Sequence, residues 1–251
     1  MSIRRINGLV CLCLISLCGV AMAADVVIIA GQSNAGGKAL FSDLATRQVD
    51  MLTCPSNVRL YEWDIPISYA NRAAFGVEVP IIHKWAAVNP AGGGQELIVI
   101  KCWKGGTNIW QWLPHPDPTR NYPRMIAAIR SALAGITVRR ISFVWVQGED
   151  DTWMEKSLAK KYLSDLMLLI GSIRSDIGFS SMPVAVVVLS HPFRSTAPWL
   201  YLVTQAQIDI SSLLPNVASV SSLGCSKYSD QIHYNARGII ALGKRIYSYI
   251  K

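Results

Sequence analysis

The sequence predicts an α/β protein, a three-layer α/β/α sandwich around a mainly parallel sheet. Apolar runs of strand length alternate along the chain with segments whose apolar residues recur at helical spacing. The apolar runs end in polar turns, most of them glycine-rich, as expected where strands alternate with helices. The chain has 251 residues, 51% hydrophobic and 16% charged, which suits one globular domain with a sizeable core.

Five apolar runs predict the strands of this sheet. They occupy residues 25–31, 96–103, 139–146, 184–189 and 217–221. The first is a continuous apolar run that stops at a glycine, which indicates a buried strand ending in a sharp turn. Residues 58–63 are a further, short candidate strand. Right-handed crossovers are expected between the parallel strands.

Helical periodicity accounts for most of the chain between these strands. Residues 38–50 look helical or irregular, and residues 198–213 look helical. Gly135 and Gly178 stand where two further helices would end, and Asn235 is suited to cap the last one. Four of the predicted helices have an apolar face: Ile81, Ile82, Trp85 and Val88; Tyr122, Met125, Ile126, Ile129 and Leu133; Leu158, Tyr162, Leu166, Leu169 and Ile173; and Ile239, Leu242, Ile246 and Ile250.

The amino-terminal segment differs in kind from the rest. Arg4 and Arg5 precede a short apolar run, and Ala21-Met22-Ala23 supplies the small-residue pattern of a signal-peptidase site. We therefore expect residues 1–23 to be a signal peptide cleaved after Ala23, and residues 24–251 to form an exported domain, periplasmic or secreted in a bacterium. The run is too short for a comfortable membrane span, so no stable membrane insertion is expected after cleavage.

Cysteine and charge content limit which disulfides and which partners can be expected. Cys54, Cys102 and Cys225 remain after cleavage, and the sequence does not choose which two of them pair, if any. The net charge of +8 comes from scattered basic residues, so no nucleic-acid partner is expected. The oligomeric state is left open.

Polar turns follow the predicted strands and would meet at one edge of a parallel sheet. The turn Gly31-Gln32-Ser33-Asn34 can project a serine hydroxyl at that edge. A plain glycine-rich loop is an alternative; a phosphate-binding loop is a weaker one, because neither glycine fingerprint of such loops is present. Gly105, Gly106 and Gln147 follow later strands and would converge with Ser33.

The last loop supplies a histidine and an acid. Asp230 lies three residues before His233, so its carboxylate can accept from one ring nitrogen and leave the other to take a proton from a hydroxyl. Ser33, His233 and Asp230 would then act as nucleophile, general base and orienting carboxylate. A helix-capping aspartate beside an exposed histidine is the alternative for an isolated pair of this spacing.

Ester hydrolysis by a serine also needs donors for the developing oxyanion. The candidates are the backbone N–H groups of Ser33 and of Gly105 or Gly106, together with the side-chain amide of Gln147. Turn glycines and a surface glutamine are their ordinary structural explanations.

Four sequence blocks occur in a fixed order: GQSNA from Gly31, KGGTNIWQW from Lys104, WVQGEDD from Trp145 and DQIHYNARG from Asp230. Together they resemble the SGNH-hydrolase superfamily, most closely the branch of sialic-acid-specific acetylesterases and carbohydrate esterase family 6 acetylxylan esterases. The blocks extend over almost the whole mature chain, and FGVEVP from Phe75 resembles a further segment of that family.

The resemblance implies a flavodoxin-like sheet of five strands, a metal-independent serine mechanism with no cofactor, and an acetylated carbohydrate as substrate. Carried over by position, Ser33 is the nucleophile, His233 the base and Asp230 its partner, while a glycine of the second block and Gln147 complete the oxyanion hole. Glu149 matches the glutamate of the third block and would orient Gln147 or support the histidine.

Some residues in these blocks stay ambiguous. Val146 stands where the family often has histidine, so that side chain's contribution is absent. Gln32, Asn34 and Trp110 are candidate substrate contacts. Hydrogen bonds that support the turn are the default explanation for the first two, and packing is the open alternative for the tryptophan. No metal is expected, because the spacing of three potential ligands is not diagnostic: His115, Asp117 and His191. A lipase or thioesterase of the same fold and a noncatalytic glycan-binding protein are the alternative functions.

Overall fold

The computed structural model describes residues 23–44, 53–190 and 197–251. Within these ranges the main sheet has seven strands. Neighbouring strands are parallel except for the antiparallel pair at one edge, β4 with β3. The strands lie in the order β4 (Ile65–Pro66), β3 (Val58–Glu62), β6 (Glu96–Trp103), β1 (Ala24–Gly31), β7 (Val138–Val146), β8 (Val184–Val188) and β9 (Val217–Ser221).

The predicted α/β class with a mainly parallel sheet is confirmed, but the sheet is wider than the five strands expected. The expected strands form its continuous part, β6-β1-β7-β8-β9, which is the 2-1-3-4-5 order of flavodoxin-like sheets. β3 pairs with the outer side of β6, and β4 adds two residues beyond it. A two-residue edge strand that contains a proline carries no periodic signal, so the sequence did not indicate β4.

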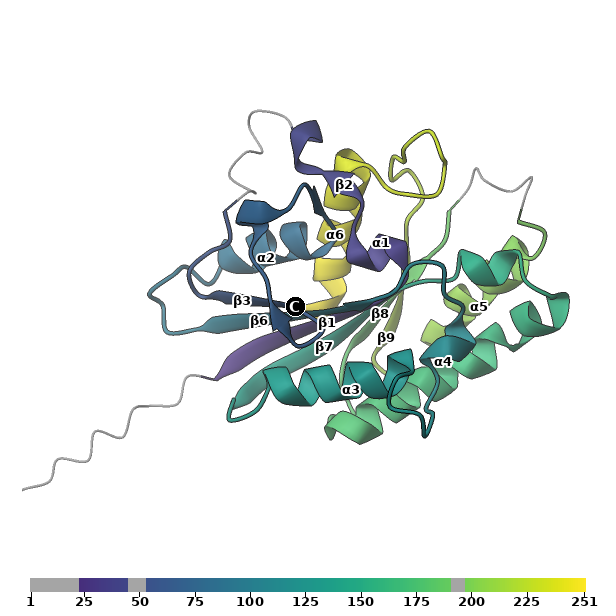
Figure 1. The fold of residues 1–251 in the computed structure, drawn as a ribbon, viewed down its shortest axis with the longest axis horizontal. Helices are drawn as coiled ribbons and strands as arrows, with labels where there is room; N and C mark the ends of the chain where they lie inside the picture. Colours follow the sequence, from purple (N-terminus) through teal and green to yellow (C-terminus); the bar gives the residue numbers. More distant parts are fainter. Residues whose placement is uncertain (1–22, 45–52, 191–196) are drawn as a thin grey trace, which may run out of the picture.

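Helices cover both faces of the sheet (Figure 1). On one face α3, α4 and α5 pack against Val26 and Ile28 of β1. On the other face α1, α2 and α6 pack against Val27 and Ile29. β1 is thus buried on both sides, which explains its uninterrupted apolar sequence. The helices are α1 (Ser33–Gly36), α2 (Glu78–Ala86), α3 (Asn121–Ala132), α4 (Lys156–Ile177), α5 (Leu200–Leu213) and α6 (Ala236–Ile250).

Two of the three predicted helix ends are confirmed at the residues that marked them, whereas α3 ends at Ala132, three residues before Gly135. Gly178 adopts a left-handed conformation with φ 76° after α4, and the Asn235 side chain accepts from the Gly238 N–H at the start of α6. Val88 lies beyond the end of α2 and is exposed. The remaining short elements are β2 (Ala39–Leu40), which pairs with β5 (Ala74–Phe75), and the 3-10 turns η1 (Phe41–Asp43), η3 (Tyr69–Asn71), η4 (Ile109–Trp112) and η5 (Asp150–Thr152).

Two predictions fall partly on residues that the structure does not describe. The helical or irregular stretch predicted over 38–50 contains β2 and η1 up to residue 44, and the rest lies outside the described residues. The predicted signal peptide also lies outside them, apart from Ala23. Among the helices of the described ranges, none combines the length and apolar character needed to span a membrane.

The three cysteines after residue 23 are all free. Cys102 on β6 belongs to the core beneath α3, α4 and α5, whereas Cys225 belongs to the core on the opposite face. The sheet therefore separates these two thiols. Cys54 is only partly buried and borders the same core as Cys225.

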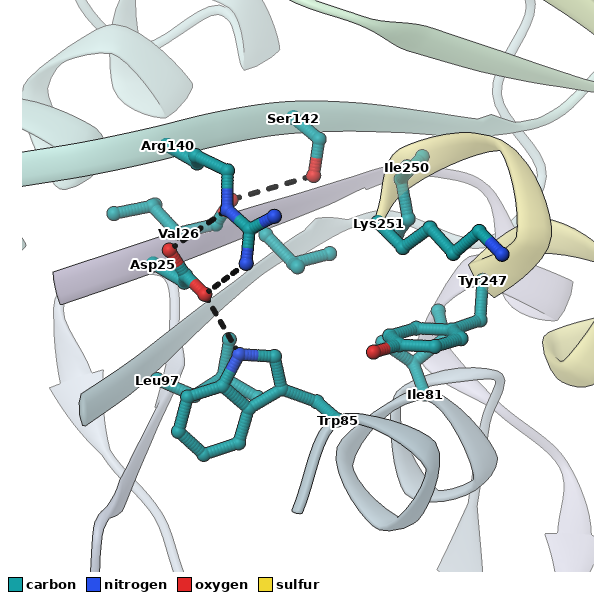
Figure 2. Close-up of a pocket in the computed structure, with 11 residues that line it drawn as sticks. Asp25, Val26, Ile81, Trp85, Leu97, Arg140, Ser142, Tyr247, Ile250 and Lys251 are labelled. Carbon is teal, nitrogen blue, oxygen red and sulfur yellow. Dashed lines mark hydrogen bonds and ion pairs between the residues drawn. The ribbon is translucent and has the colours of Figure 1, made fainter. Parts of the chain in front are cut away.

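A small pocket lined by Asp25, Trp85 and Arg140 is shown in Figure 2. It lies near the start of β1, whereas Ser33 follows the end of that strand. Asp25 is buried there and accepts from Trp85 Nε1 at 2.8 Å and from Arg140 at 3.0 Å. Arg139 donates to the same carboxylate at 2.6 Å. Burial raises the pKa of Asp25, but these hydrogen bonds outweigh it and the net pKa is lowered. The carboxylate is thus fully occupied in joining β1, β7 and α2.

Candidate active site

Ser33 is held in a tight turn directly after β1. Gly31 has φ 141°, and a Cβ there would approach the Val146 carbonyl oxygen to 2.0 Å, so only glycine allows this contact with β7. The N–H groups of Ala35 and Gly36 both donate to the Gln32 carbonyl, which closes the single turn of α1. Ser33 therefore opens a helical turn at the carboxyl edge of the sheet and is 9% exposed.

The loop between β9 and α6 brings Asp230 back onto His233. Gln231 adopts φ 59°, a left-handed conformation uncommon for a residue with a side chain. The N–H groups of Ile232 and His233 then donate to Asp230 Oδ1 at 2.8 and 2.9 Å, and Asp230 Oδ2 lies 2.7 Å from His233 Nδ1. Burial raises the pKa of Asp230, but these hydrogen bonds outweigh it and leave the pKa below its ordinary value, so the carboxylate is charged.

The second ring nitrogen of His233 reaches the serine. His233 Nε2 lies 2.8 Å from Ser33 Oγ, across a separation of 200 residues in the chain. Ser33, His233 and Asp230 thus form one continuous hydrogen-bonded series. Such a series can remove the serine proton as the hydroxyl attacks a carbonyl carbon and hold the histidine in the required tautomer.

Two backbone donors lie beside the serine. Within the described residues, the N–H groups of Ser33 and Gly105 donate to no other group of the chain. A Cβ on Gly105 would lie 3.9 Å from the Ser33 Cβ, which places this glycine next to the serine side chain. A Cβ on Gly106, at φ 64°, would instead contact Asp150 at 3.9 Å. Gly105 is therefore the better placed of the two predicted glycines.

Gln147 does not have the free amide that was expected of an oxyanion donor. Its side chain is fully buried, and Nε2 donates to the Thr107 carbonyl at 2.8 Å and to Asp151 Oδ2 at 2.5 Å. Its Oε1 accepts from Tyr162 Oη at 3.0 Å. The prediction is corrected on this point, because both amide hydrogens have acceptors within the protein. Gln147 ties the loop that carries Gly105 to the end of β7.

Asp151 is a residue of this site that the sequence reasoning missed. Besides Gln147, it accepts from the Ile109 N–H at 3.1 Å, which connects the loops after β6 and β7. Burial raises the pKa of its carboxyl group to about 7. The only sequence signal is its position at the end of the WVQGEDD block.

Asn34 and Glu149 connect the serine turn to the histidine loop. Asn34 Nδ2 donates to Glu149 Oε1 at 2.5 Å and to the Ile232 carbonyl at 3.2 Å, and Asn34 Oδ1 accepts from the Tyr234 N–H at 3.3 Å. Asn34 is 1% exposed, so the predicted substrate contact is corrected to an internal role. Of the two roles predicted for Glu149, support of the histidine agrees with its contact to Asn34 and stays a prediction. Burial raises the pKa of Glu149.

The other predicted residues lie as follows. Gln32 is also buried, with its side-chain amide 3.3 Å from Gln147 Nε2, so a direct substrate contact is corrected there as well. Trp110 is 41% exposed, with the Arg120 guanidinium 5.6 Å from its ring centre, and its substrate contact stays a prediction.

Two of the three potential metal ligands, His115 and Asp117, lie within the described residues. The Asp117 N–H donates to His115 Nδ1 within one exposed loop, and His191 lies outside the described residues. Among the residues that the structure places, no three His, Cys, Asp or Glu side chains are grouped so as to hold a metal ion.

Comparison with known families and structures relates this site to described proteins. The family model for carbohydrate esterase, sialic acid-specific acetylesterase, matches residues 23–250. An Arabidopsis thaliana protein of known structure superposes with a TM-score of 0.71 at 20% identity, over 90% of this chain and 97% of that one. Comparison with curated protein sequences gives no significant match.

Two further solved structures are similar. A carbohydrate acetylesterase from Xanthomonas citri has a TM-score of 0.69 at 18% identity, over 90% of this chain and 55% of that one. NanS has a TM-score of 0.68 at 15% identity, over 92% of this chain and 97% of that one. At these identities the structural likeness establishes a shared fold.

Proposed function

Since the chain belongs to the sialic acid-specific acetylesterase family of carbohydrate esterases, we propose that it removes O-acetyl groups from carbohydrates through an acetyl-enzyme formed on Ser33. The observation that carries this proposal is the series of hydrogen bonds from Ser33 Oγ to His233 Nε2 at 2.8 Å and from His233 Nδ1 to Asp230 at 2.7 Å. A serine with a base and an orienting carboxylate is suited to acyl transfer.

The reaction proceeds in two halves. Ser33 Oγ attacks the acetyl carbonyl carbon while His233 Nε2 takes the hydroxyl proton. The tetrahedral intermediate collapses when the bond to the sugar oxygen breaks, and His233 returns the proton to that oxygen. Water then attacks the acetyl-enzyme with the same histidine as base, which releases acetate and restores Ser33. Asp230 stabilises the imidazolium in both halves.

The developing negative charge on the carbonyl oxygen needs donors at the serine. We assign this role to the backbone N–H groups of Ser33 and Gly105. Gly105 lies next to the Ser33 side chain, and neither N–H donates to another group among the described residues. Gln147 contributes by fixing the loop of Gly105, through its bond to the Thr107 carbonyl.

An acetate-release assay tests the proposal. Purified protein is incubated with a panel of acetylated glycans and with p-nitrophenyl esters of increasing acyl length. We expect acetate from at least one glycan and a preference for the acetyl ester. A preference for long acyl chains would point to a lipase or thioesterase instead. Sugar binding without turnover, and without labelling of Ser33 by a fluorophosphonate, would indicate a noncatalytic glycan-binding protein.

We also propose that the enzyme is exported after cleavage behind Ala23. The support is the sequence of residues 1–23, together with a family match and a first strand that both begin at the end of this segment. Amino-terminal sequencing of protein recovered from the periplasm or medium of an expressing bacterium tests this. A mature chain that begins at Ala24 supports export, whereas an intact amino terminus on cell-retained protein contradicts it.

A further inference from the structure

Lys101 is a buried lysine on a strand that is otherwise apolar. It lies on β6 within the sequence LIVIKCW, next to Ile29 of β1 in the register of the sheet. Its ammonium group forms an ion pair with Glu78 Oε1 at 2.7 Å, and the two side chains are 2% and 1% exposed. A fully buried pair of opposite charges is rare enough to need an explanation.

The pair ends on the turn that carries Ser33. Lys101 Nζ also donates to the Gly36 carbonyl at 2.7 Å, and Gly36 is the last residue of α1. Carbonyls at a helix end have no partner within the helix, and a charged donor gives a shorter and stronger bond than a neutral one. The far end of the Ser33 turn is therefore fixed to β6 by a charge-assisted hydrogen bond.

Two further contacts hold the same turn in place. Glu78 Oε1 accepts from the Gly76 N–H at 2.9 Å, so the carboxylate joins the start of α2 to the lysine. A Cβ on Gly36 would lie 2.3 Å from the Trp103 ring, so α1 packs directly on β6. The turn is thus held by β6 and by the segment leading into α2.

Stability alone does not explain the pair. Taking two charges out of water is costly, and replacing a buried ion pair with uncharged side chains of similar size is often neutral or stabilising. Glu78 Oε2 also has no hydrogen-bond partner among the described residues, so the site is not optimised for stability.

We propose that Lys101 and Glu78 are positioning residues that fix α1, and through it Ser33 Oγ, at the distance from His233 Nε2 that proton transfer requires. This inference rests on the proposed function and adds to it a second support of the serine, through Gly36 at the end of α1 rather than through Asn34. Small displacements of a nucleophile lower turnover strongly, because the reacting atoms must be in contact and aligned.

The test is the double variant Lys101→Met with Glu78→Gln, which removes both charges, keeps the length of the Glu78 side chain and shortens that of Lys101 by one atom. We expect it to fold, with kcat for p-nitrophenyl acetate lower by about tenfold or more and KM changed by less than about threefold. The rate at which a fluorophosphonate labels Ser33 should fall by a similar factor. Urea unfolding of the same samples separates loss of positioning from loss of fold.

A matched control is the pair of Arg59 and Glu96 on β3 and β6, with an N–O distance of 2.5 Å and side chains 38% and 25% exposed. The double variant Arg59→Met with Glu96→Gln should keep the kcat and labelling rate of the wild type. A Lys101→Met, Glu78→Gln variant that matches the wild type in both rates overturns the positioning role. One that no longer folds also overturns it, because the pair would then be a requirement of the fold.

Ester hydrolysis and Ser33 labelling of the wild type distinguish failure of the positioning role from failure of the proposed function. If the wild type hydrolyses the ester and is labelled at Ser33, an unaffected double variant overturns the positioning role alone. If the wild type does neither, the proposed function fails and the positioning role fails with it.

Discussion

Asn34 donates to Glu149 at 2.5 Å and thereby joins the serine turn to the loop after β7. The same asparagine contacts Ile232 and Tyr234, the two residues on either side of His233. A residue adjacent to the nucleophile therefore holds the backbone of the general base from both sides. The distance between Ser33 and His233 is set by this buried side chain as well as by their own hydrogen bond.

Replacing Asn34 should lower turnover. In Asn34→Ala the backbone at His233 loses two hydrogen bonds, so we expect kcat to fall by about tenfold to a hundredfold with little change in KM. Asn57→Ala is the matched control, because Asn57 donates to the carbonyls of Asn89 and Gln95 near the amino-terminal ends of β3 and β6, at the opposite end of the strands from Ser33. Steady-state kinetics of both variants checks this.

The double variant Asn34→Ala with Glu149→Ala adds a sharper comparison. It is compared with Asn34→Ala and Glu149→Ala alone. Because Glu149 acts through Asn34, the kcat of the double variant should fall by less than the product of the two single losses. Losses that multiply fully would show that Glu149 acts by another route.

Replacing Gln147 should destabilise the protein. Gln147→Ala leaves the Thr107 carbonyl without the Gln147 donor and removes one of the two donors to the Asp151 carboxyl, which costs about 1–3 kcal/mol for a buried polar group. Urea unfolding measures this, with the exposed Gln205→Ala as control, since the Gln205 side chain donates only to Asp209 among the described residues. A variant with unchanged unfolding free energy and no turnover would contradict the structural role and restore the oxyanion role.

A methyl group at Gly105 should inhibit without unfolding. The added carbon would lie 3.9 Å from the Ser33 Cβ, in ordinary contact, and so occupy space beside the nucleophile where the acetyl group must fit. We expect Gly105→Ala to keep its unfolding free energy and to lose kcat/KM by about tenfold or more. Gly171→Ala in α4, where a Cβ meets nothing within 4 Å, is the control. Normal turnover in Gly105→Ala would place the acetyl group elsewhere.

Asp151 should make stability depend on pH. Its folded pKa of about 7 lies above the ordinary value of 3.8, so the folded state retains a proton that the unfolded state has lost. This contribution to stability is complete below about pH 4 and is lost as the pH rises to about 7, at up to about 1.4 kcal/mol per pH unit. Asp151→Asn cannot titrate, so its stability relative to the wild type should rise across that window. Urea unfolding at pH 5 and pH 7 measures the difference, and a constant difference contradicts the assignment.

The central strands and the Ser33, His233 and Asp230 set could be predicted because each leaves a local trace in the sequence. β1 is apolar throughout since both of its faces are buried, and the acid of the last loop stands three residues before its histidine. A two-residue edge strand such as β4 leaves no comparable pattern.

The contacts between distant polar residues could not be predicted. An amide in a turn looks the same in sequence whether it faces substrate, as expected of Gln147 and Asn34, or faces acceptors inside the protein. Only the packing of β7, the loop after β6 and the histidine loop decides this. Lys101 did leave a signal, as a lone charge within an apolar strand, but its partner Glu78 lies 23 residues away in the chain.

The most direct test of the account is acetate release by the wild type and by Ser33→Ala on the same acetylated glycan. The wild type should release acetate, and Ser33→Ala should release none above the uncatalysed rate while unfolding at the same urea concentration. Ser33→Ala protein that retains full wild-type activity would contradict the claim that Ser33 carries the acetyl group.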